Sequence, residues 1–123
     1  MEIVTFKNDD EGGTFFSSET ITLQFGINDF LTASPLLSTA HACQRYFFSE
    51  LPPGYQSGGD FSSRRQICVL LSGELEVMST GGETKCFVAG DVLRLEDTNF
   101  QILGRTLRVT SKGPARILNV QIE

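Results

Sequence analysis

Residues 67–79, which read ICVLLSGELEVMS, decide the fold class of this chain. The first five residues form a nearly continuous apolar run, which is typical of a buried strand. Ser72 and Gly73 then give a tight-turn signal. Residues 74–79 alternate, so that Leu75 and Val77 share one face of a second strand. The stretch therefore predicts two strands joined by a short turn.

Similar short segments flank this stretch on both sides. The segments that read as strands are Thr20–Phe25, Ala42–Leu51, Thr84–Val88, Val92–Leu95, Thr106–Val109 and Ala115–Ile122. Residues 27–37 are the best helical candidate, but Pro35 interrupts them, so we expect a loop with one helical turn. Residues 56–63 are polar and glycine-rich and predict a loop or an irregular strand start. Short strands separated by glycine turns favour an all-β sandwich or barrel.

Composition indicates one ordinary globular domain. The chain has 123 residues, of which 40% are hydrophobic and 20% charged, and we expect residues 1–123 to form a single domain. Ten phenylalanines and no tryptophan favour sheet. The formal net charge is −5, and the pair Arg64 and Arg65 is the most basic feature. This pattern predicts no binding to nucleic acid, which usually needs a clustered basic face.

The cysteines and the apolar runs indicate where in the cell the protein is expected. Cys43, Cys68 and Cys86 lack C-x-x-C spacing, and residues 1–10 contain no apolar core of a signal peptide. We therefore expect reduced thiols and a cytoplasmic protein. No apolar run approaches the roughly 20 residues of a membrane span, so no membrane partner is expected.

Two motifs carry a resemblance to a known family. The first is DFSSRRQ at residues 60–66, followed by the apolar strand and the Ser72-Gly73 turn. The second is GDVLRLEDT at residues 90–98, followed after a loop by Gly104-Arg105-Thr106. Together with DEGGTFF at residues 10–16, they resemble short, uncharacterised bacterial members of the cupin superfamily. The similarity covers most of the chain and is strongest over residues 64–98.

The resemblance implies a cupin-type jelly-roll β-barrel of six to ten strands with a small-molecule pocket inside. It also implies a homodimer, since many cupins pair through a swapped or extended N-terminal strand. Aligned in this way, the four usual metal-ligand positions hold Asp60, Ser62, Gln66 and Arg105. A catalytic metal needs about three good protein ligands, and a fixed arginine cation would repel it. We therefore expect no metal and no other cofactor.

The replaced positions suggest other chemistry. If Asp60 and Arg105 face the same pocket, they can form a carboxylate–guanidinium pair or recognise an anionic ligand. Alternatively, Arg105 points into solvent from a loop. Strand alternation would put Arg64 and Gln66 on one face, near the mouth of the barrel. Alternatively, one arginine of the 64–65 pair contacts Glu96 or Asp97 across adjacent strands.

Other residues have two interpretations each. Tyr46 and Phe48 share a strand face and read as core or interface residues, or as the apolar wall of a pocket. Cys68 shares a face with Gln66 and reads as a small buried hydrophobe or as a pocket thiol. His41 reads as a surface or rim residue, or as a general acid or base.

Three functions remain open at this stage. The first is a metal-independent enzyme of the isomerase, cyclase or lyase type, with Asp60, Arg105 and His41 as catalytic groups. Its substrate contacts would be Arg64, Gln66, Ser62, Tyr46 and Phe48. The second is a non-catalytic barrel that binds a small polar or anionic ligand, and the third is a degenerate cupin that serves dimerisation. A pocket carboxylate with a raised pKa would favour the enzyme, whereas a neutralised Asp60–Arg105 pair would favour binding or structure.

Overall fold

A computed structural model describes residues 1–26, 36–60, 64–98 and 104–122. Within these residues the regular secondary structure consists of twelve β-strands, with no helix. Their bounds are β1 Glu2–Asn8, β2 Thr14–Thr20, β3 Gln24–Phe25, β4 Leu36–Leu37, β5 Arg45–Leu51, β6 Gln56–Asp60, β7 Gln66–Ser72, β8 Glu74–Met78, β9 Thr84–Val88, β10 Val92–Leu95, β11 Arg105–Val109 and β12 Ala115–Gln121. The all-β prediction is confirmed. No helix in these residues could cross a membrane.

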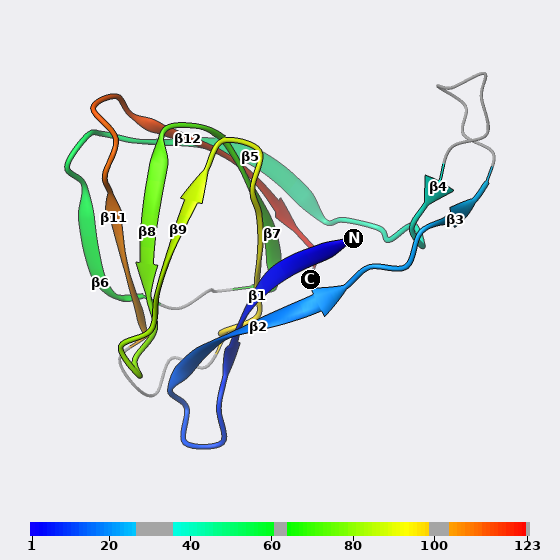
Figure 1. The fold of residues 1–123 in the computed structure, drawn as a ribbon, viewed down its shortest axis with the longest axis horizontal. Coiled ribbons are helices and arrows are strands. Elements are labelled where there is room, and N and C mark those ends of the chain that lie inside the picture. Colours follow the sequence, from blue (N-terminus) through cyan, green and yellow to red (C-terminus); the bar gives the residue numbers. More distant parts are fainter. Residues whose placement is uncertain (27–35, 61–63, 99–103, 123) are drawn as a thin grey trace.

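Two facing sheets form the barrel (Figure 1). One has six strands in the order β2-β1-β10-β7-β12-β5, and the other has four in the order β6-β11-β8-β9. Neighbouring strands are antiparallel except β1 and β10, which are parallel. Residues 67–79 form β7 and β8, which lie in different sheets, so the Ser72-Gly73 turn connects the two layers. The prediction of a jelly-roll barrel is confirmed.

A small third sheet, β3 paired with β4, projects away from the barrel (Figure 1). It accounts for one wrong prediction from the sequence. Residues 20–25 were predicted as one strand, but β2 ends at Thr20 and pairing resumes only at Gln24. Alternation alone could not reveal that this segment leaves the barrel, because it reports a face and not a partner.

Three further strands, β1, β2 and β6, were missed or left open. The hairpin of β1 and β2 was not predicted, since apolar residues in β1 adjoin charged ones at Glu2 and Lys7. The polar segment 56–60 is a strand, β6, whose backbone pairs with β11. Sheet pairing uses main-chain groups, so a glycine-rich segment can form it without an apolar pattern. The helical candidate at 27–37 lies outside the described residues up to 35, and its last two residues form β4.

The hydrophobic core lies between the two sheets, from residues near the Ser72-Gly73 turn to Phe6 and Leu95 at the level of Gln66. Its buried members come from both sheets and are Phe6, Leu70, Leu75, Val77, Phe87, Leu93, Leu95, Val109, Ala115 and Ile117. Leu75 and Val77 share the inward face, as predicted. Full burial of one such side chain contributes about 1.5–3 kcal/mol. We call the end of the barrel that holds Leu70, Val109 and Ala115 the apolar end.

The turn between the two layers gives a stability prediction. Gly73 has φ of 82°, and an added Cβ would lie 2.6 Å from the carbonyl oxygen of Pro114. Gly82 has φ of 88° but open space around the same position. We expect Gly82→Ala to lower the free energy of unfolding by about 1 kcal/mol through backbone strain. Gly73→Ala should cost at least about 3 kcal/mol, because overpacking adds to that strain.

Urea unfolding followed by far-UV circular dichroism measures both values. Equal losses for the two variants would contradict the close contact between the Ser72-Gly73 turn and residues 114–115.

Candidate functional site at the polar end of the barrel

Along β7 and β12, the inward side chains change from apolar to polar towards the end of the barrel that holds Gln66 and Gln121. Along β12 the inward positions run from Ala115 and Ile117 to Asn119 and Gln121. Along β7 they run in the reverse direction, from Leu70 through Cys68 to Gln66. The register pairs Asn119 with Cys68 and Gln121 with Gln66, so these polar groups lie side by side. We call this the polar end.

An ion pair lies in the polar end. Asp97, two residues beyond the end of β10, is completely buried, and Arg105 at the start of β11 is 8% exposed. Arg105 Nη1 donates a hydrogen bond to Asp97 Oδ2. The guanidinium carbon also lies 5.8 Å from the centre of the Phe6 ring. Buried charges are tolerated only when paired, so each of these two residues depends on the other.

Asn119 organises the neutral groups of the polar end. Ser49 Oγ donates a hydrogen bond of 2.8 Å to Asn119 Oδ1. Asn119 Nδ2 in turn lies 3.3 Å from Cys68 Sγ and 3.4 Å from Gln66 Oε1, as a donor to both. A single amide therefore connects residues from β5, β7 and β12.

A second arginine stands where the polar end meets solvent. Arg45 is exposed, and its register partner is Gln121, which is 4% exposed. Arg45 Nε donates a hydrogen bond to Gln121 Oε1. The acceptor is a neutral amide, so this contact does not offset the charge of Arg45 as Asp97 offsets that of Arg105.

Solvent reaches the polar end. Phe47 pairs with Asn119, which puts its side chain on the inner face of the sheet, yet it is 41% exposed. Gln66, Cys68 and Asn119 are half-buried in the same region. β5 is the last strand of its sheet. The polar end therefore combines inward hydrogen-bonding groups with access from outside.

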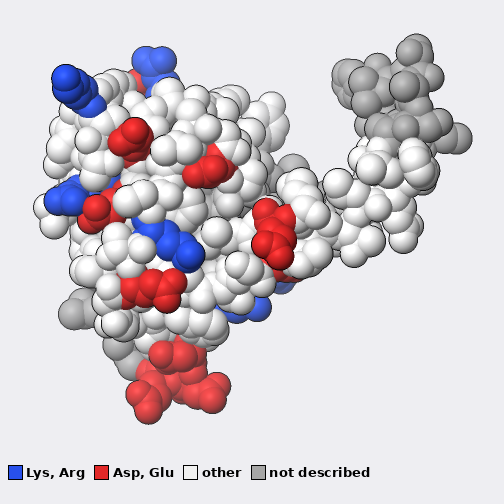
Figure 2. Space-filling model, viewed as in Figure 1, with Lys and Arg blue, Asp and Glu red and all other residues white. Residues whose placement is uncertain are grey.

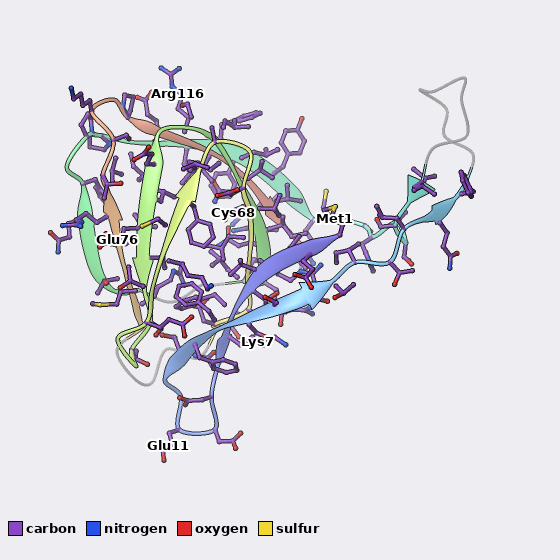
Figure 3. The ribbon with its side chains drawn as sticks, viewed as in Figure 1. Met1, Lys7, Glu11, Cys68, Glu76 and Arg116 are labelled. Atoms are coloured by element: carbon purple, nitrogen blue, oxygen red, sulfur yellow. The ribbon has the colours of Figure 1, made fainter. Side chains whose placement is uncertain are left out.

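Burial raises the pKa of the Cys68 thiol from 9.0 to about 11. The Arg105 charge and the hydrogen bond from Asn119 act against this rise, and the Asp97 charge adds to it. Figure 3 shows Cys68 between the two sheets. The thiol is therefore protonated at neutral pH and is not a ready nucleophile, because the thiolate is the reactive form.

The structure places the residues of the expected Asp60–Arg105 pair as follows. Asp60 and Arg105 are register partners on β6 and β11, while the side chain of Asp60 lies outside the described part. Ser62 lies outside the described residues. Arg105 points into the barrel and not into solvent from a loop, and it forms an ion pair with Asp97. From the sequence, Asp97 was expected only as a cross-strand partner for Arg64 or Arg65, and its burial was not predicted.

The arginine pair at the start of β7 divides as the alternative interpretation expected. Arg65 forms an ion pair of 3.1 Å with Glu96. Arg64 is exposed and donates a hydrogen bond of 2.7 Å to Gln44. Gln66 lies in the polar end, but β7 begins at Gln66, so strand alternation does not extend to Arg64.

Three other predicted residues lie outside the barrel interior. Tyr46 and Phe48 share a face, but they are 66% and 67% exposed, so the core and pocket-wall interpretations are wrong. Their alternation was correct, but Arg45, Phe47 and Ser49 face inward instead. His41 lies in surface pockets beside Ile67 and Arg94, on the outer face of the six-stranded sheet, and not at the polar end.

The described residues at the usual metal positions do not fit a divalent cation. Gln66 is a neutral amide in contact with Asn119, and Arg105 is a cation paired with Asp97. Within the part of the chain that the structure describes, no three His, Cys, Asp or Glu side chains group as a metal site would need. Chemistry through a bound metal therefore finds no support in these side chains.

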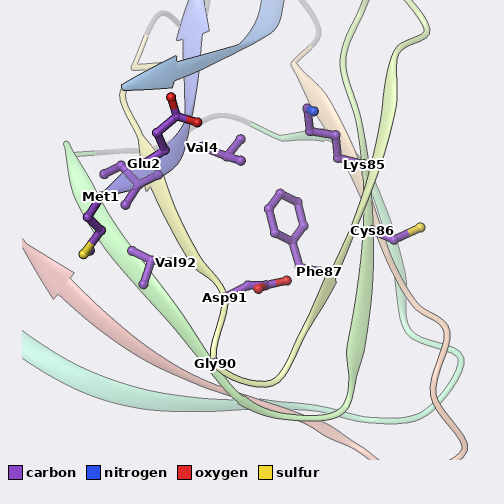
Figure 4. A pocket seen from close by; sticks show the side chains of 10 residues that line it. Met1, Glu2, Val4, Lys85, Cys86, Phe87, Gly90, Asp91 and Val92 are labelled. Carbon is purple, nitrogen blue, oxygen red and sulfur yellow. The ribbon is translucent and has the colours of Figure 1, made fainter. Parts of the chain in front are cut away.

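A surface pocket of about 410 Å³ lies between β1 and β9 (Figure 4). Phe87 points into it, whereas the Cys86 side chain points away. Asp91 Oδ2 accepts a hydrogen bond from the Val88 amide in the neighbouring turn. The polar groups here belong to separate turns and strands and form no connected set, unlike those of the polar end.

No family model matches this chain, and no curated protein sequence does. Several solved structures are similar. The cupin_2 domain of an XRE family transcriptional regulator from Enterobacter cloacae is 22% identical, with a TM-score of 0.49 over 61% of this chain and 76% of that one. A cupin protein from Bacteroides fragilis is 23% identical, with a TM-score of 0.46 over 63% and 64%. A putative ethanolamine utilization protein Q from Salmonella typhimurium is 18% identical, with a TM-score of 0.44 over 99% and 95%.

At these identities the likeness concerns the fold alone. The roles of individual residues rest on the geometry of this chain.

The ion pair gives a second stability prediction. Asp97→Ala leaves the Arg105 charge buried and should cost about 3–5 kcal/mol in the free energy of unfolding. The double variant Asp97→Leu with Arg105→Met should recover most of that loss, because it removes both charges. As a control, Glu50→Ala breaks the exposed pair with Arg116 and should cost less than about 1 kcal/mol. Urea denaturation measures all three, and a loss for Asp97→Ala as small as the control would contradict the buried pair.

Cys68 gives a prediction about pH. Its folded pKa is about 11, against 9.0 for a free thiol, so the unfolded state loses the proton first as pH rises. The contribution to stability is complete below pH 9 and should be lost as pH rises towards 11. Cys68→Ala should remove this part of the pH dependence, while Cys86→Ala, at an exposed position, should keep it. Urea unfolding under reducing conditions across that range measures the slope, and identical slopes for wild type and Cys68→Ala would refute the assignment.

Proposed function

We propose that the barrel is a metal-independent binding protein for a small carboxylate ligand, which enters at the polar end beside β5. The observation that carries the proposal is the position of Arg45, an exposed cation at the mouth whose partner on the inner face is the neutral amide of Gln121. Arg presents a planar set of donors that matches a carboxylate. A ligand anion would supply the counter-charge that Gln121 lacks.

The groups behind Arg45 support hydrogen bonding to the rest of the ligand. Asn119, Ser49 and Gln66 carry amide and hydroxyl groups on the inner face within reach of solvent. Polar groups on the inward face of a barrel cost stability unless they are satisfied, by about 1–3 kcal/mol for each unsatisfied group. The presence of several such polar groups at the polar end supports a role for them in recognition.

Binding without chemistry is better supported than the isomerase, cyclase or lyase prediction. Cys68 is protonated at neutral pH, and Asp97 is bonded to Arg105. His41, the predicted acid or base, lies on the outer face of the sheet. A buried carboxylate that is neutralised by an arginine fits a binding or structural role, as the sequence reasoning expected for such a pair.

The test uses short dicarboxylates from malonate to glutarate and the matching neutral diamides as probes. Two-dimensional NMR follows the side-chain amide signals of Asn119, Gln66 and Gln121. We expect a dicarboxylate to shift these signals saturably and the diamide of equal length to bind at least about 10-fold more weakly, a difference of about 1.4 kcal/mol. Arg45→Gln should abolish the preference, while Arg116→Gln, which removes an exposed arginine from β12, should leave it unchanged.

Other outcomes of this experiment would contradict the proposal. Shifts confined to other parts of the surface, or equal shifts by acid and diamide, would contradict recognition by Arg45. An absence of shifts with every probe in both series would contradict ligand binding at the polar end. Conversion of any probe over time would instead support the enzyme prediction.

A further inference from the structure

The β3–β4 pair and its connections to the barrel form an arm, residues 21–26 and 36–44, which projects from the barrel (Figure 1). The base of the arm lies beside Ile67 and Arg94, on the outer face of the six-stranded sheet. These arm residues include no Asp, Glu, Lys or Arg, and the arm is white in Figure 2. Charged groups between the arm and the barrel therefore come from the barrel.

Two cavities lie where the base of the arm meets the sheet. Their volumes are about 390 Å³ and about 350 Å³. Ile21, His41, Ile67 and Arg94 line both cavities, so the two adjoin and form one groove, which we call the arm groove. Pockets for small ligands usually measure about 300–1,000 Å³, and each part of the arm groove falls in that range.

The two parts of the arm groove differ in polarity. In the smaller part, Arg65 and Glu19 join Arg94, so three charged side chains lie together. In the larger part, Ile3 and Val92 join the lining from the sheet, while the arm contributes uncharged hydroxyl groups. A molecule that fills the whole groove would therefore have a charged end and an apolar end.

Arg94 is the central charged residue of the arm groove. It lies opposite Ile67 on β7 and Thr5 on β1, and its side chain is 15% exposed. Arg94 Nη1 donates a hydrogen bond to Glu19 Oε2, and Thr5 Oγ1 donates one of 3.3 Å to the same oxygen. Arg94 Nε is buried and has no hydrogen-bond partner among the described residues. Because a guanidinium carries five N–H donors, the contact with Glu19 leaves donor capacity unused.

The charges of the smaller part favour a ligand with one negative charge. Two arginines and one glutamate line it, an excess of one positive charge on a chain whose formal net charge is −5. Arg65 shares its charge with Glu96 at 3.1 Å, so Arg94 contributes most to the attraction. Glu19 would repel a second negative charge on the ligand. A monoanion therefore fits the groove better than a dianion does.

The walls beside the arginines are apolar. Ile21, Ile67 and Ile122 line the smaller part, and the lining continues to Ile3 and Val92 in the larger part. An aliphatic chain that starts at the arginines can therefore contact apolar side chains along the groove. Removal of each methylene of such a chain from water raises affinity about 4-fold.

We propose that the arm groove binds an aliphatic monocarboxylate, with its carboxylate at Arg94 and Arg65 and its chain under the base of the arm. Arginine presents a planar set of donors that matches a carboxylate. The arm groove lies outside the barrel, whereas Gln66 and Asn119 of the polar end face its interior. The proposal therefore does not depend on ligand binding at the polar end.

Two-dimensional NMR of the full chain with isotope-labelled isoleucine methyl groups tests the proposal. The probes are the straight-chain monocarboxylates from butanoate to octanoate and the primary alcohols of equal length. We expect the methyl signals of Ile21, Ile67 and Ile122 to shift saturably, while that of Ile117 in the core does not. Affinity should rise about 4-fold with each methylene, and each alcohol should bind at least about 10-fold more weakly than its acid.

Two variants should change the affinity for carboxylates in opposite directions. Glu19→Gln removes the negative charge from the lining and should tighten binding at least about 3-fold. Glu19→Gln combined with Arg94→Gln removes both members of the ion pair, so neither charge is left unpaired. This double variant should bind carboxylates at least about 10-fold more weakly than Glu19→Gln. The matched control Arg116→Gln, on an exposed arginine of β12, should leave the affinity unchanged.

Circular dichroism confirms that each variant is folded, and Glu19→Gln alone, at a side chain of 39% exposure, keeps the test available if the double variant is not. An absence of isoleucine shifts with every carboxylate would overturn the proposal. So would alcohols that bind as tightly as the acids, or carboxylate binding that Glu19→Gln weakens. Equal effects of Arg116→Gln and the double variant would also contradict recognition by Arg94.

Discussion

The ion pair between Asp97 and Arg105 is the constraint on which the use of the barrel interior depends. A guanidinium held inside a β-barrel needs a carboxylate beside it, and the completely buried Asp97 provides one. The two charges of this pair offset each other, whereas the exposed Arg45 contacts the neutral amide of Gln121. It also raises the barrier to metal binding, because one of the usual ligand positions carries this paired cation.

The inward residues change in character along the length of the barrel. Both sheets contribute to the core, and Phe6 and Leu95 extend it to the level of Gln66. The same strands change from apolar to polar inward residues as they cross the barrel, in β12 from Ile117 to Asn119 and in β7 from Leu70 to Cys68. Outside the barrel the pattern is reversed, since the outward residues of β5, β7 and β12 are mostly apolar.

Much of the fold could be predicted from the sequence, because alternation and glycine turns report strands directly. Ile67–Leu71, Leu75 and Val77 lie where their pattern placed them. Pattern alone could not predict the β1–β2 hairpin, nor that the chain leaves the barrel after Thr20. Pairing partners are a property of the whole chain. The turn at Gly73 was predicted from the sequence, but its close approach to residues 114–115 is visible only in the structure.

The candidate site was predicted only in part, for a physical reason. Alternation correctly put Cys68 with Gln66, and the family alignment brought Arg105 to the interior. Asp97 was considered only as a cross-strand partner of Arg64 or Arg65, because burial of one member of the adjacent Glu96-Asp97 pair leaves no periodic signal. Asn119 and Gln121 did leave a signal, since they interrupt the apolar inward positions of β12, and that signal was overlooked.

The measurement that tests the buried ion pair most directly is NMR of the arginine guanidinium protons in wild-type protein. The Nη protons of Arg105 should exchange slowly with water and give separate signals, because Asp97 holds the group and solvent is excluded. Arg116, whose side chain is 63% exposed in an ion pair on the outer face, should give fast exchange and averaged signals. Fast, averaged signals from Arg105 like those of Arg116 would contradict the account, and with it the assignment of Arg45 as the charge that recognises a ligand.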